Sequence, residues 1–154
     1  MSVCERIPLF KWFKITWEDG YFCLAQSKEK LIITNKSIKF TREPIHNFAY
    51  EEYGTYDKCK WSFSTDDDYY EEKLNILCIY FLNHKEKFHK INGCDTPIFT
   101  IEVKRYDGEI IKDHYCFDMK TNEMDKLIEY IMEYIPKNAQ KPYFIEGYPL
   151  DDKE

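Results

Sequence analysis

Apolar residues recur at every second position in several short segments of the chain, which is the period of a strand with one buried face. The clearest case is 59–63, where Cys, Trp and Phe alternate with Lys and Ser. Residues 74–82 are apolar on both faces of such a strand, so they predict a central strand. The pattern indicates extended segments over 10–17, 21–26, 31–34, 38–41, 59–63 and 74–82 and in both arms of a hairpin spanning 98–117, and we expect a sheet of about seven strands.

Turn residues join these strands into hairpins. Glu-Asp-Gly at 18–20 and Asn-Lys at 35–36 predict two of them near the N-terminus. The last predicted hairpin turns at Gly108. A two-residue loop would place Val103 opposite Lys112, whereas a three-residue loop with Gly108 in a left-handed conformation places Val103 opposite Ile111 and Lys112 opposite Glu102. The second register pairs apolar with apolar and base with acid, so we expect it.

One helix is predicted after the strands. Its apolar residues step by three and four along a single stripe, and Pro136 follows the stripe. The stripe consists of Met124, Leu127, Ile128, Ile131 and Ile135.

These elements predict an α+β fold, with an antiparallel, strongly bent sheet or barrel closed by one C-terminal amphipathic helix. We expect residues 1–136 to form a single globular domain. Residues 137–154 are expected to form an aromatic and acidic tail that packs on the domain or on a partner. The predicted core comprises Trp61, Phe63, Ile76, Cys78, Phe99, Ile101, Val103, Ile111, Leu127, Ile128 and Ile131.

Composition narrows the class of protein. The 154 residues carry a net charge of −6, and 18% are aromatic, including 13 Tyr. A chain this rich in aromatic residues is not intrinsically disordered. Its net negative charge argues against direct nucleic-acid binding. The first residues do not form a signal peptide and no apolar run is long enough to span a membrane, so we expect a cytoplasmic protein. The six widely spaced cysteines are expected to be free thiols.

The sequence contains none of the common catalytic motifs. Glycine-rich phosphate loops, HExxH and GxSxG are all missing, so we expect no cofactor and no enzymatic activity. His84, His89 and Cys94 lie too far apart for a typical zinc site, and the lysines among them favour a solvated basic loop, so no metal is expected. His114 and Cys116 share a strand face, but neighbours on one strand point in parallel.

An acidic and aromatic stretch is the main candidate site. It allows three interpretations: a solvated loop, a divalent-cation site, or a surface that binds a basic protein. The Asp spacing lacks the alternation and glycine of a calcium loop. Tyrosines provide large contacts at interfaces, and clustered acids steer a basic partner. The candidate binding residues are Tyr53, Tyr56, Asp66, Asp67, Asp68, Tyr69, Tyr70, Glu71 and Glu72.

The element order resembles the pleckstrin-homology-like superfamily, including its GRAM-type members. Leu-Ile-Ile-Thr-Asn-Lys at 31–36 resembles a GRAM strand and turn, and Tyr-Cys-Phe-Asp at 115–118 with the following helix resembles the last strand and capping helix. The resemblance covers roughly residues 10–136 and implies a bent sheet with a capping helix. Phosphoinositide-binding members carry bases around the first hairpin turn, whereas this chain has Glu-Asp-Gly at 18–20.

Three functional hypotheses follow. The first is a non-enzymatic protein-binding module, of inhibitor or immunity-protein type, whose acidic surface engages a basic partner. The second is a pleckstrin-like domain that binds a ligand or lipid. The third is a small enzyme with an unfamiliar site at His114 and Cys116. The second hypothesis would use a basic rim at Lys11, Lys14, Lys85, Lys87 and Lys90.

Overall fold

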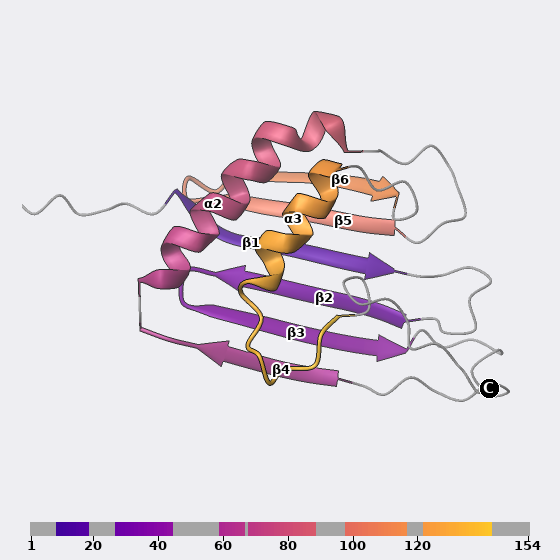
Figure 1. The fold of residues 1–154 in the computed structure, drawn as a ribbon. Helices are drawn as coiled ribbons and strands as arrows, with labels where there is room; N and C mark the ends of the chain where they lie inside the picture. The colour runs from indigo at the N-terminus through magenta and orange to yellow at the C-terminus, as the bar shows by residue number, and fades with distance from the viewer. Residues whose placement is uncertain are drawn as a thin grey trace, which may run out of the picture.

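The computed structural model describes residues 9–18, 27–44, 59–66, 68–88, 98–116 and 122–142. Within these residues, an antiparallel sheet of six strands has the order β4-β3-β2-β1-β5-β6, and two α-helices lie across one face of it (Figure 1). The α+β class is therefore confirmed. The elements are β1 (Phe10–Glu18), β2 (Ser27–Thr34), β3 (Ser37–Pro44), β4 (Cys59–Ser64), α2 (Tyr69–His84), the 3-10 turn η1 (Lys85–Lys87), β5 (Ile98–Arg105), β6 (Ile110–Cys116) and α3 (Asn122–Met132).

The sheet is open, with β4 and β6 at its two edges. Neither a closed barrel nor a seventh strand is confirmed among the described residues. The N-terminal strand β1 lies near the centre, where Phe13 is paired with Ile33 of β2 and with Val103 of β5. The predicted partner of β1 was 21–26, which lies outside the described residues. Its partner on that side is β2.

Two predicted hairpins are confirmed. Between β2 and β3, the hydroxyl of Thr34 accepts hydrogen bonds from the backbone N–H groups of Lys36 (3.2 Å) and Ser37 (3.0 Å), which stabilises the turn. Between β5 and β6, Val103 is paired with Ile111, as the three-residue loop requires. Gly108 has a φ of 102°, a conformation that side chains with a Cβ rarely adopt.

The strand predicted at 74–82 is wrong, because these residues lie inside α2. Leu74, Leu77, Cys78 and Phe81 are buried at helical spacing, and they pack on the sheet. Ile76 and Ile79 are also apolar, but they lie on the outer side of the helix and are exposed. Because Ile76 and Ile79 are apolar as well, a strand drawn through this segment would have apolar residues on both faces, as a buried central strand does.

The core fills the space between the sheet and the helices. The stripe predicted for α3 is buried along its whole length, including Ile135 just beyond the helix. Of the other predicted core residues, Cys78, Ile101 and Val103 are buried, and Trp61 and Ile111 are partly buried. The predictions for Phe63 and Ile76 are wrong, since both are more than 40% exposed. The side chain of Phe99 lies outside the description.

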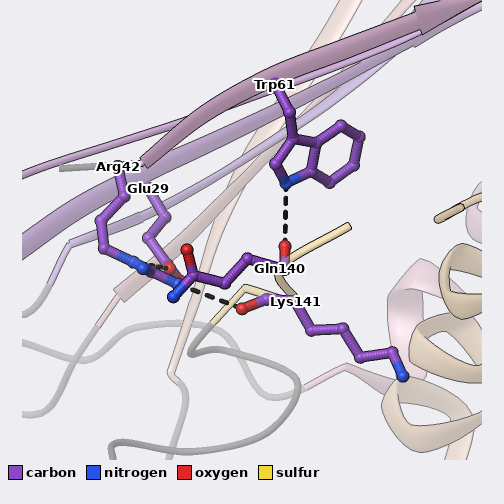
Figure 2. A network of polar contacts seen from close by, with 5 residues as sticks. All are labelled: Glu29, Arg42, Trp61, Gln140 and Lys141. Atoms are coloured by element: carbon purple, nitrogen blue, oxygen red, sulfur yellow. Dashed lines mark hydrogen bonds and ion pairs between the residues drawn. The ribbon is translucent and has the colours of Figure 1, made fainter. Parts of the chain in front are cut away.

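A polar network on the helix side of the sheet holds the segment that follows α3 (Figure 2). Arg42 Nε donates to Glu29 Oε2 at 2.8 Å, and an Arg42 NH2 group donates to the Lys141 carbonyl at 3.1 Å. The indole N–H of Trp61 donates to the Gln140 carbonyl at 2.8 Å. Residues 137–142 therefore lie over β3 and β4. The aromatic residues predicted to pack in the tail, from Tyr143 on, lie outside the described residues.

Candidate functional site

The acidic and aromatic stretch lies at the N-terminus of α2. Asp66 and Asp68 precede the helix, and Tyr69, Glu71 and Glu72 are in its first turn. The segment is partly helical, since the backbone carbonyl of Asp68 accepts hydrogen bonds from the backbone N–H groups of Glu71 and Glu72. Tyr53, Tyr56 and Asp67 lie outside the described residues, so their predicted proximity to this segment stays a prediction.

The two described tyrosines of the stretch differ in their environment. Tyr70 is partly buried, stacks on Tyr134 with ring centroids 5.4 Å apart, and meets Phe63 edge-on at 6.0 Å. Burial, followed by the neighbouring Tyr69, raises the pKa of Tyr70. Tyr69 is 48% exposed. Tyr70 thus packs between Phe63 of β4 and Tyr134 of the segment after α3, whereas Tyr69 is available for contact.

The acids of the stretch interact with the N-terminus of α2 and also place negative charge at the protein surface. Carboxylates near the N-terminus of a helix interact favourably with its dipole, although the side chain of Asp68 makes no capping hydrogen bond. Lys36 lies 3.9 Å from Asp68 in a solvent-exposed pair, which contributes little energy. Asp66, Asp68 and Glu72 remain exposed.

An exposed apolar surface on the outer side of α2 adjoins these acids. Tyr69, Glu72, Ile76 and Ile79 are separated by three or four residues and lie along one side of the helix, and we call them the α2 outer surface. Ile76 is 43% exposed and Ile79 is 41% exposed. The arrangement therefore places two large aliphatic side chains in water beside an exposed acid and an exposed tyrosine.

The opposite face of the sheet is rich in lysine. Residues on the strands alternate between the core and this uncovered face, so every second position meets solvent. Seven lysines occupy such positions, and we call them the lysine face: Lys14, Lys28, Lys30, Lys39, Lys60, Lys104 and Lys112. A chain with a net charge of −6 therefore presents one strongly basic surface.

A hollow of about 430 Å³ lies in the lysine face. We call it the lysine hollow. Lys14 Nζ lies 3.4 Å from Glu102 Oε2, and the hydroxyl of Thr100 lies 2.8 Å from His114 Nδ1. Lys30 and Lys112 form no ion pair within the described part of the chain. The hollow is lined by Lys14, Thr16, Lys28, Lys30, Thr100, Glu102, Lys112 and His114.

The basic rim predicted for a pleckstrin-like ligand does not assemble in the described residues. Lys85 lies 3.5 Å from Asp113, which alternates with the lining residues Lys112 and His114 and so lies on the helix side. Only Lys14 of the rim lines the hollow. Lys87 is exposed beyond α2, and Lys90 lies outside the described residues.

Two of the histidines considered for a zinc site or a catalytic pair, His84 and His114, have structural partners. His84 Nδ1 lies 2.9 Å from the Tyr80 carbonyl, and its ring stacks on Tyr80 with centroids 4.1 Å apart. His114 is exposed and contacts Thr100. The side chain of Cys116 lies outside the description, as do His89 and Cys94, so the structure does not test the zinc and catalytic pairings.

Sequence reasoning missed the lysine face because it searched for contiguous basic segments. The lysines of the face are dispersed along all six strands and alternate with core residues, as Lys39 does between Ile38 and Phe40. Projection of each predicted strand onto its two faces was the signal that would have revealed them.

A scan against protein-family models finds no match, and no curated protein sequence is significantly similar to the chain. In the described residues, neither helix combines the length and the apolar character that crossing a membrane requires.

Proposed function

We propose that this protein is a non-enzymatic binding module, of inhibitor or immunity-protein type, and that it docks a basic protein on the α2 outer surface. The observation that carries the proposal is the exposure of Ile76 and Ile79 beside Tyr69 and Glu72 on one side of a single helix. Large apolar side chains grouped on a surface are typical of protein interaction sites.

The chemistry of the surface favours a protein partner with basic residues. Two isoleucines and a tyrosine supply apolar and aromatic contacts of the kind that anchor interfaces. Asp66, Asp68 and Glu72 supply negative charge at the end of the surface. Clustered acids accelerate association with a basic partner and orient it before contact.

The proposal assigns different roles to the acidic and aromatic residues. Tyr69 contacts the partner, whereas Tyr70 holds the N-terminal end of α2 in place by stacking on Tyr134. The carboxylates act mainly on the association rate, because exposed charge pairs contribute little to affinity. Tyr53, Tyr56 and Asp67 lie outside the described residues and stay predicted contacts of the partner, and Glu71, which is partly buried, supports the surface.

The test is quantitative partner recovery from the source organism with the tagged protein, followed by binding of the purified partner. The apolar variant carries Ile76→Ser and Ile79→Ser, and its control carries Ile110→Ser, an isoleucine that is 50% exposed on the other face of the molecule. We expect the apolar variant to bind at least tenfold more weakly and the control to bind like the parent protein.

Charge steering is tested separately. Asp66→Asn, Asp68→Asn and Glu72→Gln together should lower the association rate at low salt at least tenfold, and added salt should remove the difference. Glu86→Gln with Glu109→Gln is the control, because both carboxylates are exposed elsewhere. Equal binding by both isoleucine variants, or recovery of an acidic partner, would refute the proposal.

A further inference from the structure

The lysine hollow lies on the face of the sheet opposite α2, so it is independent of the proposed docking surface. Its floor is formed by four neighbouring strands. In one row across them, Lys30 is paired with Thr16, Thr16 with Thr100, and Thr100 with His114. In the next row, Lys14 is paired with Glu102, and Glu102 with Lys112. Cationic groups thus surround two hydroxyl groups on a rigid sheet.

We propose that this hollow binds a compact polyanion, namely a soluble small molecule that carries two or more phosphate groups. Four lysines line the hollow and one carboxylate, that of Glu102, opposes them. Lys30 and Lys112, which form no ion pair within the described residues, flank the hollow from β2 and β6, and the repulsion among its cationic groups is relieved by a bound anion.

The donors of the hollow match phosphate chemistry. Lysine ammonium groups bind phosphate oxygens as point charges, and hydroxyl groups such as those of Thr16 and Thr100 donate to the same oxygens. Glu102 lies 3.4 Å from Lys14, so the pair holds that lysine over the floor and leaves Lys30 and Lys112 for the ligand.

The size of the hollow and the charge of the chain favour a small ligand over a long polyanion. About 430 Å³ is within the range of small-molecule sites, which is roughly 300–1,000 Å³. A nucleic acid would extend over Lys39 and Lys60, which lie on the same face but do not line the hollow. It would also meet the long-range repulsion of a chain with a net charge of −6.

The lysines outside the hollow provide a matched control. Lys30→Gln with Lys112→Gln removes two charges from the hollow, and Lys39→Gln with Lys60→Gln removes two charges from the same face beside it. None of the four lysines forms an ion pair within the described residues, so both variants are expected to fold.

The experiment is calorimetric titration of the full chain with inorganic tripolyphosphate and with ATP at low salt. We expect one site per chain, a dissociation constant raised at least tenfold by the hollow variant, and a change of less than threefold in the control. Sedimentation with phosphatidylserine vesicles tests the lipid source, and we expect no binding. The proposal is overturned by heat-silent titrations with no thermal stabilisation, by equal weakening in the two variants, or by vesicle binding that tripolyphosphate does not displace.

Discussion

Glu29 and Arg42 form an ion pair with no exposure to solvent, at the point where β2 and β3 place them directly opposite each other. The distance from Arg42 Nε to Glu29 Oε2 is 2.8 Å. The arginine also donates to the Lys141 carbonyl. One pair therefore joins the second and third strands to the segment that follows the last helix.

Removal of one charge of this pair should strongly destabilise the fold. Arg42→Met removes the guanidinium group that faces the buried Glu29 carboxylate, and we expect the free energy of unfolding to fall by about 3–5 kcal/mol. The double variant Glu29→Leu and Arg42→Met should lose less than Arg42→Met alone, because no buried charge remains. Urea unfolding of the parent, single and double variants measures this, and a single variant within 1 kcal/mol of the parent would contradict it.

The helical state of α2 predicts opposite outcomes at two adjacent residues. Leu77 is fully buried, and Leu77→Ala should cost about 2–5 kcal/mol of unfolding free energy. Ile76 is 43% exposed, and Ile76→Ala should cost under about 1 kcal/mol, because alanine also has the higher helix propensity. A strand with both faces buried would penalise both substitutions. Chemical denaturation of the two variants distinguishes these cases.

Gly108 should resist substitution for backbone reasons alone. A Cβ at this position would meet nothing within 4 Å, but the φ of 102° is one that other residues rarely adopt. Gly108→Ala should therefore lower the unfolding free energy by about 1–2 kcal/mol. Glu109→Ala, at the next position of the turn, is the control. Thermal unfolding of both variants provides the measurement, and an equal effect would contradict the strain argument.

Stability should decline in alkaline solution because of buried tyrosines. Burial raises the pKa of Tyr134 above its ordinary value of 10.0, and burial also raises the pKa of Tyr115. Above about pH 10 the unfolded chain releases these protons while the folded chain retains them. The contribution of these tyrosines to the free energy of unfolding is therefore fully present below the pKa that they have in the unfolded chain. It is lost as the pH rises toward their pKa in the folded chain.

Tyr134→Phe provides the test of this linkage. The variant removes a hydroxyl whose hydrogen bond to the Tyr70 carbonyl is long, at 3.4 Å, so its cost at pH 8 should be small. We expect its unfolding free energy to fall less steeply than that of the parent between pH 9 and about pH 11. Parallel slopes for the two proteins would show that Tyr134 titrates normally in the fold.

The parts of the fold predicted from sequence are those that local chemistry determines. The register of β5 and β6 follows from one turn glycine and from the pairing of Val103 with Ile111. Most residues of α3 outside the apolar stripe are polar, so the helical period is visible in the sequence. In α2 the exposed Ile76 and Ile79 hide the helical period, and only the tertiary fold shows which side is covered.

The candidate site was predictable in the same limited sense. Asp66 and Asp68 belong to one short acidic segment of the sequence, which a search along the chain detects directly. The lysine face does not, because Lys30 and Lys112 become neighbours of one hollow only when β1 and β5 are inserted between their strands. Phe63 was placed in the core because its strand alternates correctly, but β4 is an edge strand and leaves it 42% exposed.

The central position of β1 has a consequence for synthesis on the ribosome. Phe13 is made before its pairing partner Val103, which follows β2, β3, β4 and α2 along the chain. Until then, one hydrogen-bonding edge of β1 has no strand to cover it, and such an edge attracts other chains. The β2–β3 hairpin can form at once, whereas β1 gains its second neighbouring strand only when β5 has been made, so the nascent chain passes through a stage in which a strand from inside the finished sheet is still open to other chains.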